Sequence, residues 1–379
     1  MERVNLMRTV FTCILTAIML ILFQTVDAQA NIWSPTGSMA AGRGAHRAIK
    51  LSNGKVLVVG GYTDSGDHTG AELYDPATSS WNAAGFMSVA RCRHSVTLLP
   101  NGKVLVAGGG YGSGYISLSS AELYDPTTNS WSMAASMSTE RYGHTATLLP
   151  NGKVLVVGGI NSNNSNTVAS AEIYDPATNS WSAANPTTTG RYSHEAVLLP
   201  NGNVLVVGGF IANGLNTEAA NAELYNPITN SWSSAGSLST PRYYHSVTLL
   251  NNGKVLVTGG YNAGSGTLSS SELYDPATNG WSAAASMATA RYILFGSTLL
   301  SSGKVLVAGG YTSGSGSYLT SAEIYDPATD SWSAAAPLTT ARFGHSLTLL
   351  SNGKVLVAGG YIFGSSNYLS SAELYTPFD

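Results

Sequence analysis

The sequence predicts an all-β fold, a seven-bladed β-propeller made of four-stranded antiparallel blades. The first observation behind this prediction is a pair of glycines that recurs about every fifty residues along the 379-residue chain, as a repeat fold requires. The second is that each repeat holds four short strand-like segments and no helical periodicity. One such sheet buries neither face alone, whereas seven stacked around an axis bury both. The pairs begin at Gly60, Gly108, Gly158, Gly208, Gly259, Gly309 and Gly359.

The repeat that begins at Arg141 shows how each strand is predicted. Residues 144–149 (HTATLL) alternate in polarity, an Asn-Gly pair then supplies a hairpin turn, and residues 153–157 (KVLVV) are apolar on both faces. After the glycines comes a polar loop. Residues 171–175 (AEIYD) form a third strand, which ends because the following proline cannot donate to the ladder. Residues 180–184 (SWSAA) complete the blade.

The two ends of the chain are predicted to complete one blade together. Six repeats reach a tryptophan seven residues after their tyrosine, but the last repeat has Tyr375 and no tryptophan. Trp33 instead precedes every glycine pair. Residues 31–39 are therefore expected to form the missing fourth strand beside residues 371–379, which pairs both open sheet edges.

The N-terminal segment has the pattern of a signal peptide. Two arginines precede an apolar run at residues 10–23, and residues 28–30 (AQA) match a small-x-small cleavage site. This predicts a signal peptide at residues 1–30 and a propeller domain at residues 31–379, located in the periplasm or outside the cell. An uncleaved N-terminal anchor is the alternative. No second apolar run follows, so we expect no membrane span after signal removal.

The composition limits the partners. Charged residues make up 10% of the chain and the net charge is −3, whereas ordinary domains have about 25% charged residues. Without a basic excess, nucleic acid is not an expected partner. Cys92 is the one cysteine after the signal segment, so no intrachain disulfide is expected there. We expect a monomer.

These repeats resemble a known family. The glycine pair, a tyrosine about fifteen residues later, a tryptophan seven residues after that and the fifty-residue period are similar to the kelch repeat. The version with "NGKVLVAGG" resembles bacterial-type kelch repeats, which are related to the central domain of galactose oxidase. The resemblance covers residues 31–379 and implies a fold; it does not imply an activity.

One face of the predicted propeller carries the long variable loops, and the residue after each glycine pair lies at the start of these loops. Aromatic rings with hydroxyl groups at this position suit a sugar or a peptide, most of all near blades five to seven. The alternative is that these rings only cap the blades. The candidate ligand-binding residues are Tyr62, Tyr111, Phe210, Tyr261, Tyr311 and Tyr361.

Every blade also repeats an arginine and a glutamate, which we expect to pair as a structural ring of ion pairs. An anion-binding ring is the alternative, although an asymmetric ligand rarely needs seven equivalent groups. The arginines are Arg43, Arg91, Arg141, Arg191, Arg242, Arg291 and Arg342. The glutamates are Glu72, Glu122, Glu172, Glu223, Glu272, Glu323 and Glu373.

Three metal-site hypotheses are open. Six blades have a histidine three residues after the arginine, and blade six has Leu294 there; we expect these imidazoles to bond to backbone rather than to a metal. The resemblance to galactose oxidase implies a copper site of tyrosines and histidines with a tyrosine–cysteine cross-link, for which Tyr244, His245 and Cys92 are the candidates. That site also needs a histidine from a following domain, and none is expected because the chain ends with blade seven. The loop with Asp64, Asp67 and His68 offers cation ligands.

No Ser-His-Asp grouping, phosphate loop or pair of catalytic carboxylates stands out from the repeats. We therefore expect no catalytic residues, no cofactor and no bound metal. The prediction is a secreted, non-catalytic module that presents its loop-rich face to a protein or carbohydrate ligand. The alternative is a galactose-oxidase-like copper enzyme or another glycan-active propeller enzyme.

Overall fold

Seven apolar segments of four residues form the second strand of each blade. A tight turn with glycine at positive φ precedes each of them and a glycine pair ends it. All their side chains are buried, because both faces of these strands pack against neighbouring blades. They are β3 (Val56–Val59), β9 (Val104–Ala107), β15 (Val154–Val157), β21 (Val204–Val207), β27 (Val255–Thr258), β33 (Val305–Ala308) and β39 (Val355–Ala358).

The computed structural model describes residues 31–377 except 113–114, 215, 294, 315 and 363–366, so the predicted signal peptide lies outside the described residues. The first strand of each blade lies nearest the central axis. These innermost strands are β2 (Arg47–Lys50), β8 (Ser95–Leu98), β14 (Thr145–Leu148), β20 (Glu195–Leu198), β26 (Ser246–Leu249), β32 (Gly296–Leu299) and β38 (Ser346–Leu349).

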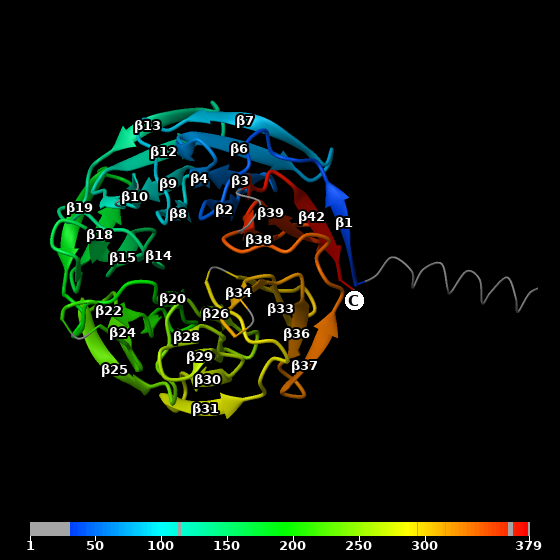
Figure 1. Cartoon of the computed structure of the whole chain (residues 1–379). Coiled ribbons are helices and arrows are strands. Elements are labelled where there is room, and N and C mark those ends of the chain that lie inside the picture. Colours follow the sequence, from blue (N-terminus) through cyan, green and yellow to red (C-terminus); the bar gives the residue numbers. More distant parts are fainter. Residues whose placement is uncertain are drawn as a thin grey trace, which may run out of the picture.

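The third and fourth strands complete each antiparallel sheet toward the rim. The third strands are β6 (Gly70–Asp75), β12 (Ala121–Asp125), β18 (Ala171–Asp175), β24 (Asn221–Asn226), β30 (Ser271–Asp275), β36 (Ala322–Asp326) and β42 (Ala372–Thr376). The outermost strands are β7 (Ser80–Phe86), β13 (Ser130–Ala134), β19 (Ser180–Ala184), β25 (Ser231–Ser237), β31 (Gly280–Ala284), β37 (Ser331–Ala335) and β1 (Ile32–Thr36). Seven four-stranded sheets therefore surround one axis (Figure 1), which confirms the predicted fold class.

The seventh sheet has the order β1-β42-β39-β38 and so contains strands from both ends of the chain. Trp33 is opposite Tyr375 in the β1–β42 pairing, with ring centroids 5.0 Å apart. The Trp33 indole donates to the carbonyl of Ala336 in blade six at 2.9 Å. The tryptophans of the other blades make the same bond to the preceding blade, for example Trp131 to Ala84 at 2.7 Å. The seam therefore has the same contacts as the other blade boundaries.

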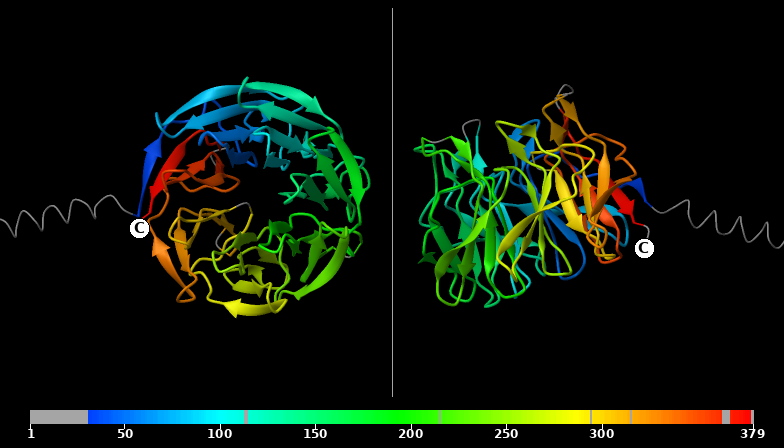
Figure 2. Two further views of the ribbon diagram at one scale, coloured as in Figure 1. Left: turned by 180° about the vertical axis from the view of Figure 1, so that it is seen from behind. Right: turned by 90° about the horizontal axis from the view of Figure 1, so that it is seen from below.

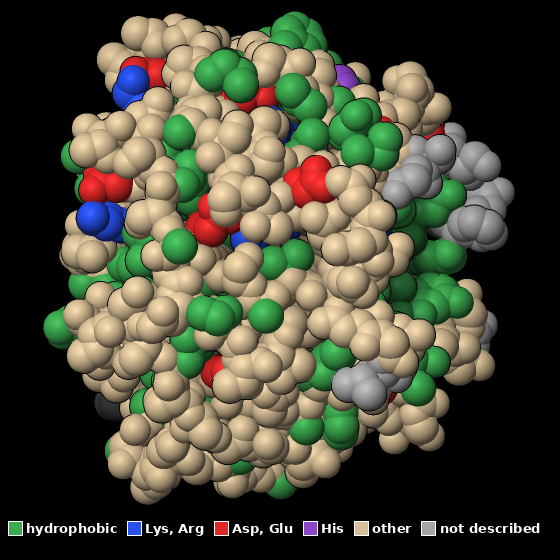
Figure 3. All heavy atoms as spheres, turned by 90° about the vertical axis from the view of Figure 1, so that its left-hand side faces the viewer, with side chains coloured by type: hydrophobic (Ala, Val, Ile, Leu, Met, Phe, Trp, Pro, Cys, Tyr) green, Lys and Arg blue, Asp and Glu red, His purple; other side chains and the backbone are tan. Residues whose placement is uncertain are grey.

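The core lies between the blades. Alternate residues of β3 point in opposite directions: Leu57 and Val59 pack against blade two, whereas Val56 and Val58 pack against blade seven. Outside this core the surface is mostly neutral and polar. Figure 3 shows one side of the molecule, where lysines and carboxylates are few and scattered.

The loops after the glycine pairs are predicted as polar loops, but the structure folds each into a two-stranded hairpin. The chain reverses at the tip of several of them through non-glycine residues at positive φ, such as Ser165 and Asn216. Figure 2 shows these hairpins on one face of the disc, the hairpin face. The hairpins are β4 (Tyr62–Thr63) with β5 (Gly66–Asp67), β10 (Gly110–Tyr111) with β11 (Ile116–Ser117), β16 (Ile160–Asn161) with β17 (Asn166–Thr167), β22 (Phe210–Ile211) with β23 (Thr217–Glu218), β28 (Tyr261–Asn262) with β29 (Gly266–Thr267), β34 (Tyr311–Thr312) with β35 (Ser317–Tyr318), and β40 (Tyr361–Ile362) with β41 (Asn367–Tyr368). Within the described part of the chain, no helix has the length and apolar character needed to cross a membrane.

Candidate functional site

A ring of backbone around the central axis, the collar, forms the base of the hairpin face. The collar residue of each blade lies two positions after the repeat arginine and has a positive φ, between 49° and 66°. In five blades its N–H donates to the carbonyl of the equivalent residue in the preceding blade, for example Ser193 to Gly143 at 2.9 Å. The left-handed backbone directs the N–H out of its own sheet and toward the neighbour. The collar residues are Ala45, Arg93, Gly143, Ser193, Tyr244, Ile293 and Gly344.

The glycine pairs allow the blades to approach at the collar. The second glycine donates its N–H to the carbonyl of the next blade's repeat arginine, as Gly159 does to Arg191 at 2.8 Å. A Cβ on the first glycine, Gly158, would stand 2.6 Å from the same carbonyl oxygen. Both glycines also have positive φ, of 67° and 99°. Alanine therefore fits neither position.

Aromatic rings lie above the collar in a continuous run across blades four to seven, which we name the aromatic crown. Neighbouring rings of the crown have centroids 4.8–5.8 Å apart. All of these rings are partly exposed. The crown comprises Tyr192, Phe210, Tyr243, Tyr261, Tyr292, Tyr311, Tyr318, Phe343, Tyr361 and Tyr368.

Short backbone bridges place these rings side by side. In each blade the residue after the glycine pair bridges the residue after the arginine, as Phe210 does with Tyr192 and Tyr261 with Tyr243. Burial raises the pKa of Tyr192 to about 12, so its hydroxyl remains protonated at neutral pH. The crown therefore offers ring faces together with hydroxyl donors and acceptors.

The structure brings four of the six predicted ligand-binding residues, Phe210, Tyr261, Tyr311 and Tyr361, into the crown. Tyr62 belongs to a separate group with Tyr115 and Tyr142, at 5.7 and 5.4 Å between successive centroids. Tyr111 is 38% exposed and lies outside both groups, because Gly110 occupies the bridging position after the glycine pair.

Six of the ten crown residues come from positions that the sequence prediction did not include. Four crown residues follow a repeat arginine directly, so an aromatic residue at that position was the available signal. Tyr318 and Tyr368 come from hairpin strands whose folding the sequence did not predict. The residues that follow an arginine are Tyr192, Tyr243, Tyr292 and Phe343.

The repeat arginines and glutamates support the collar from below. All seven pairs lie within a blade, are buried and have N–O distances of 2.7–3.0 Å. Arg141 also donates to the carbonyls of Gly158 and Ser170, and Glu172 accepts the N–H of Ser138 from the loop that enters the blade. These pairs therefore fix the glycine pair and the entering loop, and do not present an open ring of charge to an anion.

The histidines form a layer beneath the collar. Nε2 of His46, His144 and His194 bonds at 3.0 Å to a serine or threonine hydroxyl in the preceding blade, a partner that the sequence did not predict. These imidazoles also interact with backbone as expected, for example His144 with Arg141 and Ala107. Burial, and then the charge of Arg342, lowers the pKa of His345 to about 3, so this imidazole is neutral at physiological pH.

Blade six differs from the other blades in this layer. Leu294 lies outside the described residues, and Phe295 takes the position of the histidine against Gly259. The reason is one extra residue: Gly309 lies 18 positions after Arg291, whereas this separation is 17 in blade seven. Counting three residues from the arginine therefore selects the wrong residue in this blade.

The donor groups considered for copper do not converge. The Cys92 thiol is buried, donates to the Gly110 carbonyl at 3.3 Å and interacts with the hydroxyl of Tyr62, and burial raises its pKa to about 11. The Tyr244 hydroxyl accepts a hydrogen bond from Arg93. Among the described residues, no group of three or more histidine, cysteine, aspartate or glutamate side chains is arranged to hold a metal. These residues do not fit a copper centre.

The first hairpin uses its carboxylates for contacts with other hairpins. Asp67 accepts the N–H of Gly112 at 2.5 Å, and Asp64 accepts the N–H of Tyr368 at 3.3 Å. Asp64, Asp67 and His68 therefore do not form a cation site; the two carboxylates connect blade one to blades two and seven.

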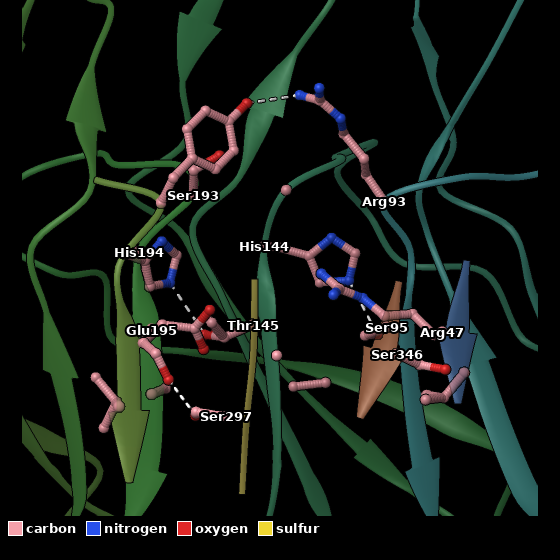
Figure 4. A pocket seen from close by; sticks show the side chains of 18 of the residues that line it. Arg47, Arg93, Ser95, His144, Thr145, Ser193, His194, Glu195, Ser297 and Ser346 are labelled. Atoms are coloured by element: carbon pink, nitrogen blue, oxygen red, sulfur yellow. Dashed lines mark hydrogen bonds between the residues drawn. The ribbon is translucent and has the colours of Figure 1, made fainter. Parts of the chain in front are cut away.

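Below the collar the axis contains a cavity of about 390 Å³ (Figure 4). It is lined by the histidine layer and by the first residues of the innermost strands. Ser95, Thr145, Ser246 and Ser346 contribute hydroxyl groups to its wall.

Comparisons with known proteins agree with this architecture. A family model described as the KLHDC2/KLHL20/DRC7 Kelch-repeats domain matches residues 143–360, more than half of the chain, and the Kelch motif matches residues 46–85 and 90–138. No curated protein sequence matches the chain.

Two similar solved structures show the same fold at 18% identity. One is described as a "novel fungal alcohol oxidase with catalytic diversity among the AA5 family, in complex with copper", with a TM-score of 0.72 over 91% of this chain and 76% of that one. The other is described as the structure of YjhT, with a TM-score of 0.60 over 79% of this chain and 98% of that one. With seven blades in the structure and kelch models matching most of its repeats, this chain belongs to the kelch-repeat family.

Proposed function

We propose that the protein is an exported, non-catalytic binding module whose aromatic crown takes a protein or carbohydrate ligand. The observation that carries this proposal is the unbroken run of ten partly exposed rings across four blades. Exposed aromatic surface of this extent is characteristic of a binding site. Kelch propellers are typically interaction modules, which supports the same reading.

The chemistry of the crown favours a neutral carbohydrate chain over a charged peptide. Its ten members are tyrosines and phenylalanines, so they offer flat faces and hydroxyl groups without charge. Such rings provide contact area at a small entropy cost because they have only two rotatable side-chain bonds. Neighbouring rings at 4.8–5.8 Å form a continuous surface across blades four to seven, which suits an extended ligand.

The test is to apply purified protein to a glycan array and a peptide array. We expect binding to neutral glycans, and binding to peptides alone would shift the ligand class to protein. Binding to neither array would contradict the proposal.

Export is tested on the same preparation. Intact mass of the protein recovered outside the cytoplasm should correspond to a chain that begins at Asn31. Recovery of the full-length chain from the cytoplasm would contradict export.

The alternative, a copper enzyme, is favoured by the likeness to the copper-containing alcohol oxidase. The positions of Cys92 and Tyr244 oppose it, because the thiol bonds to the Gly110 carbonyl and the phenol to Arg93, and no metal-holding group of side chains is present among the described residues. Elemental analysis decides between the two functions: stoichiometric copper in the purified protein would favour the enzyme.

A further inference from the structure

Two residues of the cavity wall differ from their equivalents in the other blades. The first residue of the innermost strand is serine, threonine or glycine in five blades, but Arg47 in blade one and Glu195 in blade four. Blades one and four lie three positions apart in a ring of seven. Figure 4 shows the two side chains entering the pocket from opposite sides, from β2 and β20.

Neither Arg47 nor Glu195 is held in a close ion pair, unlike the repeat arginines and glutamates. The Nε of Arg47 donates to the carbonyl of His94 at 3.0 Å, and among the described residues Arg47 forms no ion pair of the kind that the repeat arginines make. The Glu195 carboxylate has no hydrogen bond or ion pair in the described part of the chain. The structural pairs, by contrast, have N–O distances of 2.7–3.0 Å. The two side chains therefore face a common space without filling each other's hydrogen-bonding capacity.

Removing an unpaired carboxylate from bulk water is costly. Burial raises the pKa of Glu195 to about 7, and the charge of Arg47 opposes this rise. An additional donor placed between the two residues would supply the partner that Glu195 lacks. An additional carboxylate would match the guanidinium fork of Arg47.

A side-chain bridge lies between this space and the crown. Arg93 of blade two donates from Nη1 to the hydroxyl of Tyr244 of blade five at 2.9 Å, and its guanidinium lies 4.7 Å from the centroid of Tyr115. In Figure 4 this bond lies above His144 and His194. Arg93 and Tyr244 line the upper part of the cavity, and the Tyr244 ring also lies against Tyr243 of the crown.

We propose that this cavity is a second binding site, for a small carboxylate that also carries an ammonium or hydroxyl group. The carboxylate of the ligand faces Arg47, and its ammonium or hydroxyl group faces Glu195. The hydroxyls of Ser95, Thr145 and Ser346 complete the polar wall. The volume of about 390 Å³ lies within the range of small-molecule sites, about 300–1,000 Å³. Amino acids and 2-hydroxy acids share this chemistry, and this site does not depend on the function proposed for the crown.

The test is a thermal-shift screen of the purified protein with the twenty common L-amino acids, lactate and malate at millimolar concentration. Each compound that raises the melting temperature is then titrated by calorimetry. We expect Arg47→Gln to weaken binding of every such compound by about tenfold or more, because the bidentate contact is lost. Arg47→Lys keeps the charge without the fork and should give an intermediate loss.

Glu195→Gln distinguishes the two ligand sources. This substitution should lower the affinity for an amino acid by about tenfold, because the ammonium loses its charged partner. It should lower the affinity for a hydroxy acid by only about threefold or less. The matched control is Lys103→Gln, a half-exposed cation at the turn before β9, which should bind as the parent protein does. No response to any of the compounds, or equal affinity in the parent protein, Arg47→Gln and Glu195→Gln, would overturn the proposal.

Discussion

Glycine is required twice in every blade because a Cβ at either position would stand too close to a neighbouring atom, which is a carbonyl oxygen in most blades. At Gly158 the nearest atom is the Arg191 carbonyl oxygen at 2.6 Å, and at Gly159 the Tyr142 carbonyl oxygen lies at 3.0 Å. The glycine at a turn before a second strand is different. Gly102 has a φ of 82° but nothing within 4 Å of its Cβ position. Comparing the two kinds of glycine therefore separates the cost of a left-handed backbone from the cost of a close contact with a neighbouring blade.

Gly158→Ala should therefore destabilise the protein more than Gly102→Ala. Both substitutions place alanine in a left-handed conformation, at about 1 kcal/mol. Only Gly158→Ala adds the overlap with a neighbouring blade, for a total of about 3 kcal/mol or more. Urea unfolding followed by tryptophan fluorescence measures the difference, and equal losses would show that close approach is not the reason for this glycine.

A second residue-scale prediction concerns the buried ion pairs. Glu172→Ala should cost about 3–5 kcal/mol, because Arg141 is left buried without its partner. The control is Asp175→Ala in the same blade, whose pair with Lys153 is on the surface and should contribute little. Comparable losses of unfolding free energy for the two variants would contradict a special role for the buried arginine–glutamate pairs.

The recurrence of arginine and glutamate in every repeat made their pairing predictable. The second role of Glu172, accepting the N–H groups of Ser138 and Thr139, was not predictable from sequence. It depends on the path of a loop backbone, and backbone groups are present whatever the residue type. The copper hypothesis depended on whether the side chains of Cys92 and Tyr244 lie close together in space. Their spacing in the sequence does not decide this.

At the scale of elements, the residue just before an innermost strand is a buried histidine in six blades, and these histidines matter for acid stability. The folded-state pKa of His345 is about 3, below the ordinary value of 6.5, because burial disfavours the charged form. The unfolded chain therefore binds more protons between these two values. The contribution of the neutral His345 to the free energy of unfolding is complete above pH 6.5 and is lost progressively as the pH falls toward 3.

His345→Phe should reduce this pH dependence. Phenylalanine already occupies the equivalent position in blade six, as Phe295, so the substitution is compatible with the fold. The slope of unfolding free energy against pH between 6 and 4 should fall by up to one proton, about 1.4 kcal/mol per pH unit. Denaturant titrations at several pH values measure the slope, and an unchanged slope would show that His345 does not titrate as proposed.

The four strands of each blade were predictable because their alternation and their turn residues agree. The hairpins were not, because two-residue strands such as β16 and β17 contain too few residues to show a period. They are stabilised by contacts between neighbouring hairpins, including Thr167 with Asn213 of the next blade. The extra residue in blade six was visible as a longer spacing, yet Phe295 could be placed only once the strand register was known.

At the scale of the whole molecule, the ring joins the two ends of the chain in one sheet. β1 contributes five residue pairs to β42, and Trp33 is 7% exposed. Trp33 packs with Val355, Val357 and Leu306, so β1 also covers the core between blades six and seven. The position of Trp33 ahead of every glycine pair indicated this arrangement, whereas the crown required the three-dimensional bridges between strands.

Deletion of residues 31–39 should lower the melting temperature of the whole ring. It exposes the edge of β42 and the core beneath Trp33. Deletion of residues 160–168, an equal length in the hairpin of blade three, is the control and should cost less. Thermal unfolding followed by circular dichroism compares the two, and a larger loss for the hairpin deletion would contradict the importance of the seam.

The central claim is that the aromatic crown is the binding surface, and one affinity comparison tests it most directly. The triple substitution of Tyr261, Tyr311 and Tyr361 by alanine removes three crown rings, and Phe86→Ala removes a 70%-exposed ring from the outermost strand of blade one as a control. Each variant is titrated with the glycan or peptide that the parent protein selects on the arrays. We predict at least about a hundredfold loss for the triple variant, since burying one aromatic ring against a ligand contributes about 1–3 kcal/mol, and no loss for Phe86→Ala. Unchanged affinity in the triple variant would contradict the account.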